Sequence, residues 1–112
     1  MKNSQDIYAL AELAEAAQIE IQARFSHLDP VVGVSRNMRD AGFPVDVMTI
    51  NSLKNGKRIT LLLNDDAPGV ISYQFGFRDR DPGALYSEVA FETLTQSQLC
   101  DWVVAYFGDK DG

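Results

Sequence analysis

The sequence predicts an α+β fold of two layers, in which helices cover one face of an antiparallel sheet. Three observations support it: an apolar stripe at helical spacing near the N-terminus, strand-like runs separated by turn signals from Phe43 to Thr93, and a second apolar helix near the C-terminus. We expect a four-stranded antiparallel meander of order 1-2-3-4, with the N- and C-terminal helices packed on one face. The 112 residues are expected to form one globular domain, 1–112.

The N-terminal helix is marked by apolar residues at steps of three and four, which place them on one helix face. They are Ile7, Leu10, Ala14, Ala17, Ile21 and Phe25. Since the middle of this stripe is alanine, we expect the helix to lie close against the layer that it covers.

Residues 29–42 allow two interpretations. One is a helix across the whole segment, since Asp29-Pro30 suits a helix start and Gly42 suits a stop. The valines at 31, 32 and 34 and Gly33 argue against it, because β-branched residues and glycine lower helix propensity. We therefore expect a shorter helix that begins near Ser35 and ends in the sequence RDAG.

Asn55-Gly56 between two strand-like runs is the strongest short signal for a β-hairpin. We expect a two-residue loop at this point. It would pair Lys54 with Lys57, Ile50 with Leu61 and Met48 with Leu63.

The connection 65–69 has to keep the apolar residues of its two strands on one face, because a one-residue slip would turn them all outward. A five-residue loop does so, whereas a tight Pro68-Gly69 turn would put Leu61 beside Gly76. The pairs that follow are Leu63 with Ile71, Leu61 with Tyr73 and Ile59 with Phe75. By the same logic, Phe75 is expected opposite Val89 and Tyr73 opposite Phe91.

These registers divide the sheet into an apolar face and a mostly water-facing one. The apolar face is predicted to hold Met48, Ile50, Ile59, Leu61, Leu63, Ile71, Tyr73, Phe75, Phe77, Val89 and Phe91. The other face is predicted to hold Val47, Thr49, Asn51, Thr60, Leu62, Asn64, Ser72, Gln74, Gly76, Glu88, Ala90 and Glu92.

The C-terminal helix has clear ends. Thr95 and Gln98 form a capping box, and Gly108 is a suitable stop. The segment LCDWVVAYF between them has one charged residue, Asp101, and is too apolar for an ordinary surface helix. We expect it to cover the sheet, with the remainder under the first helix or in a subunit interface.

The formal net charge of −6 argues against non-specific nucleic-acid binding, which requires many cations to neutralise phosphates. Basic residues nevertheless outnumber acidic ones between residues 24 and 58. Arg36 and Arg39 are expected to share a helix face, and Lys54, Lys57 and Arg58 cluster at the first hairpin. Such a patch suits an acidic peptide or a nucleic acid, but the aromatic residues that would stack on bases fall on the predicted core face. We expect nucleic acid not to be the partner.

The residue inventory limits the chemistry. His27 and Cys100 are the single histidine and the single cysteine, which excludes a tetrahedral zinc site built from several such ligands. Cys100 lies among apolar residues of a helix, where cysteine is usually a small core residue. No phosphate-binding glycine loop, nucleophile elbow or dinucleotide fingerprint is present, so we expect no metal and no cofactor. A single cysteine and the absence of a signal peptide or a membrane-spanning run lead us to expect a cytoplasmic protein without membrane contact.

The sequence FGFRDRDPGALYSE, residues 75–88, is open to two interpretations. Alternating Arg78, Asp79, Arg80 and Asp81 followed by Pro-Gly is typical of a solvated hairpin tip. Alternatively, Arg78 and Arg80 bind carboxylates or phosphates of a partner, which arginine does well through its forked guanidinium.

Two functions follow as hypotheses. The first is a non-catalytic protein–protein interaction module that binds another protein, with Arg78, Arg80, Arg36 and Arg39 as binding residues and a homodimer as a further option. The alternative is a small-molecule-binding domain or minor enzyme. Its pocket would lie between the helices and the sheet, lined by Tyr73, Cys100, Trp102 and Tyr106.

Overall fold

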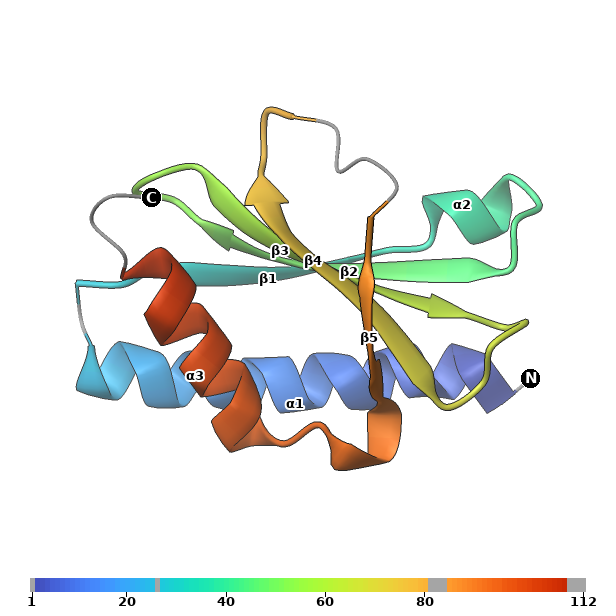
Figure 1. The fold of residues 1–112 in the computed structure, drawn as a ribbon, viewed down its shortest axis with the longest axis horizontal. Helices are drawn as coiled ribbons and strands as arrows, with labels where there is room; N and C mark the ends of the chain where they lie inside the picture. Colours follow the sequence, from blue (N-terminus) through green and yellow to red (C-terminus); the bar gives the residue numbers. More distant parts are fainter. Residues whose placement is uncertain (1, 26, 81–84, 109–112) are drawn as a thin grey trace.

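The computed structural model describes residues 2–25, 27–80 and 85–108. An antiparallel sheet of order β1-β2-β3-β4-β5 carries the N- and C-terminal helices on one face (Figure 1). The elements are α1 (Lys2–Arg24), β1 (Pro30–Ser35), α2 (Asn37–Asp40), β2 (Val45–Ser52), β3 (Lys57–Asn64), β4 (Val70–Phe77), β5 (Ser87–Ala90), the 3-10 turn η1 (Phe91–Thr93) and α3 (Gln96–Phe107). The predicted α+β class, meander order and helix placement are confirmed.

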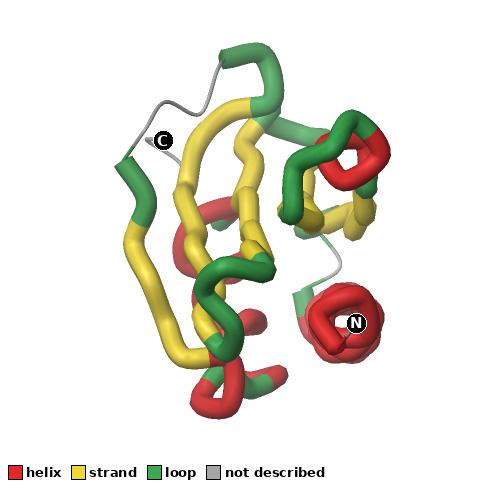
Figure 2. Tube along the Cα trace, turned by 90° about the vertical axis from the view of Figure 1, so that its right-hand side faces the viewer, coloured by secondary structure: helices red, strands yellow, loops and turns green. Residues whose placement is uncertain are grey.

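The two long helices pack together and form the layer beneath the sheet. α1 lies under β1 and β2 and is seen end-on in Figure 2, whereas α3 crosses under β3 and β4. Five of the six apolar residues predicted for the stripe of α1 are buried, and Phe25 packs at its edge. Ala14 and Ala17 lie against Ile50 and Val103, and the space between them is too small to admit a water molecule. Their short side chains let α1 approach the sheet closely.

α3 begins as its sequence predicts. The Thr95 side chain accepts a hydrogen bond from the backbone N–H of Gln98 at 3.1 Å. Leu99, Cys100, Val103 and Phe107 are buried, and this apolar side of α3 packs on α1 and on the sheet.

The sheet has one strand more than the four that we expected from the sequence. β1 pairs antiparallel with β2, which places Val32 opposite Ile50 and Gly33 opposite Thr49. Its β-branched residues suit a strand, and proline is tolerated at the first position of an edge strand. The short helix that we expected near Ser35 is α2, and Gly42 follows it at φ +103°, the left-handed conformation of a helix stop.

The predicted β2–β3 register is wrong by two residues. Met48 lies opposite Leu61 and Ile50 opposite Ile59, so the turn contains the four residues 53–56 instead of two. Ser52 Oγ accepts from the Lys54 N–H, and Asn55 Oδ1 accepts from the Lys57 N–H. The longer turn is closed by these side chains. Because a shift of two leaves each side chain on its original face, the predicted core residues of both strands remain buried.

The β3–β4 register is confirmed: Leu63 pairs with Ile71, Leu61 with Tyr73 and Ile59 with Phe75. The β4–β5 register is not. Val89 lies opposite Ile71, and Tyr73 lies opposite Ser87, because β5 is short and Phe91 already belongs to η1. The Phe75 ring packs on Trp102 and Tyr106 of α3 instead of facing Val89, and 41% of the residue remains exposed.

The two faces of the sheet differ in what covers them. α1 and α3 cover the face of Met48, Ile59 and Leu61, all of which are inaccessible to solvent. α2 and the chain after β4 rise on the other side, which carries no long helix (Figure 1). Among the described residues, no helix combines the length and the apolar composition required to span a bilayer.

Two neighbouring leucines of β3 test this division. Leu61→Ala opens a cavity under α1 and α3, and we expect it to lower the free energy of unfolding by about 2 to 5 kcal/mol. Leu62→Ala removes the same atoms from the uncovered face, with an expected loss of about 1 kcal/mol or less. Urea denaturation of both variants measures the difference. Equal losses would contradict the assignment of the two faces.

Candidate functional site

A groove lies on the uncovered face of the sheet. Its volume is about 780 Å³, and it is open to solvent along one side. The described residues that line it are Met38, Val47, Thr49, Arg58, Thr60, Leu62, Gln74, Phe75, Gly76, Phe77, Arg80, Leu85 and Tyr86. This set is apolar for the most part and carries two arginines.

The floor of the groove is made by the three central strands. Val47 of β2 lies opposite Leu62 of β3, and Thr49 lies opposite Thr60, which in turn lies opposite Gln74 of β4. These residues alternate along each strand with the buried core residues, as the pleat of a β-strand requires. On the β1 side, Thr49 lies opposite Gly33. Because glycine has no side chain, nothing from this position covers Thr49.

The two rims come from segments outside the central strands. Met38 of α2 forms one rim, and Leu85 and Tyr86 before β5 form the other. Gln74 Nε2 donates to the carbonyl oxygen of Leu85 at 2.7 Å, which holds that segment near β4. The Leu85 side chain is 88% exposed although it is fully apolar. Burial raises the pKa of Tyr86, so its hydroxyl is neutral and able to donate a hydrogen bond at physiological pH.

Arg58 and Arg80 give the groove its charge. Arg58 Nε donates to Asn51 Oδ1 at 2.7 Å, and the Arg80 guanidinium lies 4.7 Å from the centre of the Phe77 ring. Within the described part of the chain, neither arginine has a carboxylate at ion-pair distance. The described residues that line the groove include no aspartate or glutamate. The described residues that line the groove therefore contribute two positive charges, whereas the chain has a formal net charge of −6.

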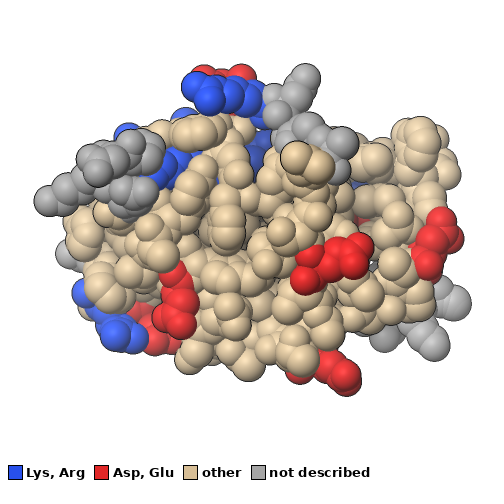
Figure 3. All heavy atoms as spheres, in the orientation of Figure 1, with Lys and Arg blue, Asp and Glu red and all other residues tan. Residues whose placement is uncertain are grey.

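The fold brings further cations to the same end of the sheet. The Arg78 N–H donates to the Gly56 carbonyl at 2.9 Å, which joins the end of β4 to the turn that carries Lys54. A second hollow of about 360 Å³, lined in part by Arg78 and Asp79, shares Phe77 and Arg80 with the groove. Figure 3 shows most Lys and Arg atoms in the upper part of the molecule and most Asp and Glu atoms lower down. The predicted turn at Asp81-Pro82-Gly83 lies outside the described residues.

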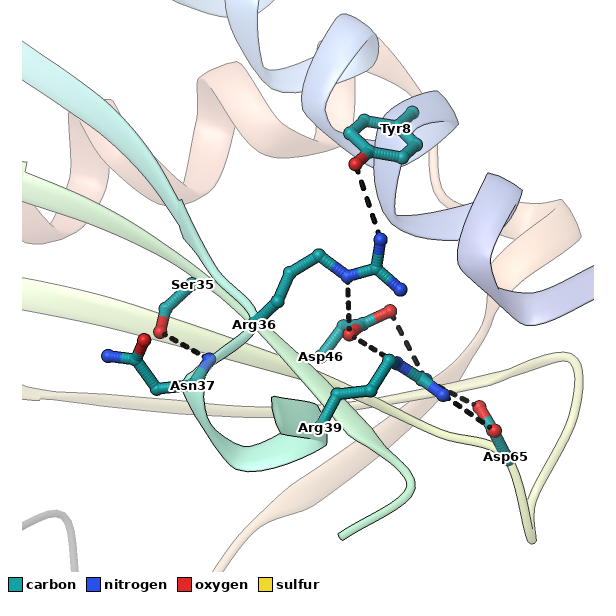
Figure 4. A network of polar contacts seen from close by, with 7 residues as sticks. All are labelled: Tyr8, Ser35, Arg36, Asn37, Arg39, Asp46 and Asp65. Atoms are coloured by element: carbon teal, nitrogen blue, oxygen red, sulfur yellow. Dashed lines mark hydrogen bonds and ion pairs between the residues drawn. The ribbon is translucent and has the colours of Figure 1, made fainter. Parts of the chain in front are cut away.

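Arg36 and Arg39, expected from the sequence as binding residues, belong to an internal network (Figure 4). Both donate to the fully buried Asp46, from Arg36 Nε at 3.3 Å and from Arg39 Nε at 2.8 Å. Arg39 also holds Asp65 through two hydrogen bonds of 3.0 and 2.8 Å, and Arg36 reaches Tyr8 Oη at 3.3 Å. The hydrogen bond to Asp65, and to a smaller extent the one to Asp46, raises the pKa of Arg39. The network fastens α2 to β2, to the β3–β4 loop and to α1.

The four residues predicted to line an internal pocket lie on two sides of α3. Tyr73 stacks on Trp102 at 4.5 Å between ring centres, and Phe75 packs on Trp102 and Tyr106. The Tyr106 hydroxyl donates to the Gly76 carbonyl at 2.8 Å. Cys100 faces α1 instead, with its Sγ 3.4 Å from Glu20 Oε1 and 3.7 Å from the Ala17 carbonyl. The structure thus joins the three aromatic residues and separates Cys100 from them.

The chemistry of Cys100 is that of a buried thiol. Burial, and then the Glu20 carboxylate, raise its pKa to about 11. The thiol is therefore protonated at neutral pH, whereas a cysteine nucleophile must be a thiolate. Elsewhere in residues 2–25, 27–80 and 85–108, no three His, Cys, Asp or Glu side chains come together in an arrangement suited to a metal ion.

Comparisons of the chain with protein-family models, with curated proteins and with solved structures find no match. Fold and site together describe an α+β sheet protein with one open face, in which a groove carries two arginines. Its function has to be argued from that geometry.

The sequence contained part of the signal for the groove. Val47 and Leu62 are apolar on the face predicted to be water-facing, and Leu85 is apolar in a loop, which together mark an incompletely solvated surface. Sequence reasoning singled out Arg58 and Arg80 but placed them in separate features. Their proximity depends on the β3–β4 pairing, in which Arg58 lies opposite Gly76.

We expect Asp46→Asn to destabilise the protein by about 2 to 3 kcal/mol, because it removes the buried negative charge that pairs with two guanidinium groups and puts an NH2 donor in place of the Oδ2 acceptor of Arg39 Nη2. Asp66→Asn, at an exposed carboxylate of the β3–β4 loop, is the matched control and should change stability by no more than about 0.5 kcal/mol. Thermal and urea unfolding of the two variants give the comparison. A fully stable Asp46→Asn protein would contradict a structural role for the network.

The thiol of Cys100 should react slowly in the folded protein. Each pKa unit changes the thiolate fraction tenfold, so a pKa of about 11 leaves about a hundredfold less thiolate at pH 8 than an ordinary cysteine has. We expect iodoacetamide labelling, followed by mass spectrometry, to be at least this much slower than in urea. Glu20→Gln should speed the labelling modestly, because the substitution removes the carboxylate that raises the pKa of Cys100 in addition to burial. Native labelling as fast as in urea would refute the assignment.

Proposed function

We propose that this protein is a non-catalytic binding module that acts on another protein through the uncovered face of its sheet. The observation that carries the proposal is the groove, an apolar trough on a face without a helix cover. Apolar side chains remain exposed along it, among them Leu85, Met38 and, on β1, Val31. Contiguous exposed apolar surface of this kind is typical of protein interaction sites.

The extent of this surface favours a macromolecular partner. Val31 lies opposite Asn51 on the same face as the groove, so the exposed residues run from β1 to the segment before β5. A small ligand would fill the groove alone, whereas a polypeptide segment would also cover Val31 and Leu85. The hydroxyl and amide groups of Thr49, Thr60 and Gln74 offer it hydrogen bonds along the floor.

The chemistry available on this face also supports binding over catalysis. A general base or nucleophile has to lie within hydrogen-bond reach of a bound substrate. The described side chains that line the groove are apolar residues, hydroxyls, one amide and two arginines, and they include no histidine, cysteine or carboxylate. Cys100 lies on the opposite side of the sheet, against α1.

Site-specific photo-crosslinking in cells tests the proposal. With a benzoylphenylalanine at position 85, on the rim of the groove, we expect one predominant protein adduct. The same residue at position 19, where Ile19 is exposed on α1, should give none. The adduct at position 85 should disappear when Thr49→Trp fills the groove, and the purified partner should bind the wild-type chain and not this variant. Equal adducts from both positions, or no adduct at position 85, would contradict binding through this face.

A further inference from the structure

We propose that the groove binds an acidic segment of the partner protein, with its carboxylates against Arg58 and Arg80 and an apolar side chain over Val47 and Leu62. This inference rests on the function proposed above and adds the chemistry of the bound segment.

The described residues that line the groove carry a charge opposite to that of the protein as a whole. The chain carries a formal net charge of −6, and yet thirteen described residues line the groove with two arginines and no acid among them. Interfaces match a positive patch with a negative one, and the match directs both partner choice and association rate. A basic segment would gain nothing from this site and would be repelled by Arg58 and Arg80.

Both guanidinium groups are held in place while keeping donors for a ligand. Arg58 uses its Nε for Asn51, and within the described chain no acceptor contacts its two terminal nitrogens. Arg80 lies over the Phe77 ring, a contact that orients the planar group without using its N–H donors. A guanidinium with two parallel donors recognises a carboxylate in a bidentate way. The site is thus prepared for carboxylates before the partner arrives.

The floor between the arginines and Met38 requires the ligand to be partly apolar. Val47 and Leu62 lie opposite one another in this floor, and Leu85 is exposed at the rim. A nucleic acid would place phosphates and sugars here, and its affinity would depend on many more cations than the groove offers. A peptide with acidic and apolar residues satisfies both the floor and the arginines.

Selection from a phage-displayed library of random 12-residue peptides tests the inference. Peptides are selected on the wild-type protein and depleted on Thr49→Trp, whose folding is checked by circular dichroism and thermal unfolding. We expect the survivors to be enriched in Asp and Glu next to Leu, Ile, Val or Phe. Synthetic versions should bind with an affinity that falls between 50 and 300 mM NaCl, because the charged contacts are partly exposed.

Charge variants identify the residues responsible. Arg58→Gln and Arg80→Gln should each weaken an enriched peptide about tenfold, the equivalent of about 1.4 kcal/mol. Arg24→Gln is the matched control on α1, with 62% of its side chain exposed, and should change affinity less than about twofold. Arg80→Glu should lose the acidic peptide and regain affinity for the version with lysine in place of its glutamate. These readouts do not depend on the Thr49→Trp variant.

The possible failures are distinguishable. Neutral or basic peptides that Thr49→Trp rejects, and that bind both glutamine variants normally, would overturn the acidic-segment inference and leave the proposed function standing. Displacement of the peptides by a 12-nucleotide thymidine oligomer would assign the groove to nucleic acid and overturn both. Peptides insensitive to Thr49→Trp, or no enrichment at all, would likewise count against both.

Discussion

The alternation of side chains along β2 and β3 is the constraint on which the rest of the structure depends. Met48, Ile50, Ile59 and Leu61 all point to one face, and burying them requires a helical layer on that face alone. α1 and α3 meet this need together, and the alanines in the middle of α1 let it come close. The strand residues that alternate with these four point to the opposite face. The groove is therefore a direct consequence of covering the sheet on one side.

Two adjacent basic residues at the start of β3, Lys57 and Arg58, point to opposite faces of the sheet. Lys57 points inward, where its Nζ donates to the Tyr106 carbonyl at 2.9 Å and lies 4.7 Å from the Tyr106 ring. Asn55 adds a hydrogen bond to the Phe107 carbonyl, so the last turn of α3 is tied to the β2–β3 turn. Arg58, the next residue, points to the groove. Adjacent basic residues thus have opposite roles, one in holding α3 and one in the surface proposed to bind a partner.

At the other end, the Asp46 network sets the rim of the groove. Arg36 and Arg39 flank Met38 in the sequence and both point to Asp46. With these two side chains held by Asp46, the short α2 presents Met38 to the groove. A helix of this length would have little stability on its own, since most helix stability comes from tertiary contacts. The ion pairs therefore matter for the shape of the candidate site as well as for the fold.

Sequence alone determined the features that depend on local periodicity. The apolar stripe of α1, the Thr95 cap of α3, the β3–β4 register and the core residues of β2 and β3 all follow from spacing, because burial needs one face and a strand or helix repeats it regularly.

Features set by contacts between distant segments were decided by the tertiary structure. β1 pairs with the edge of β2, Asn55 of the 53–56 turn donates to the end of α3, and Phe75 packs on Trp102. The roles of the arginines were also decided by the tertiary structure. Arg36 and Arg39 form ion pairs with Asp46, and Arg39 also pairs with Asp65. Strand pairing instead brings Arg58 and Arg80 to one groove. No local pattern distinguishes these two pairs, since a charge is neutralised by whichever side chain the fold places beside it.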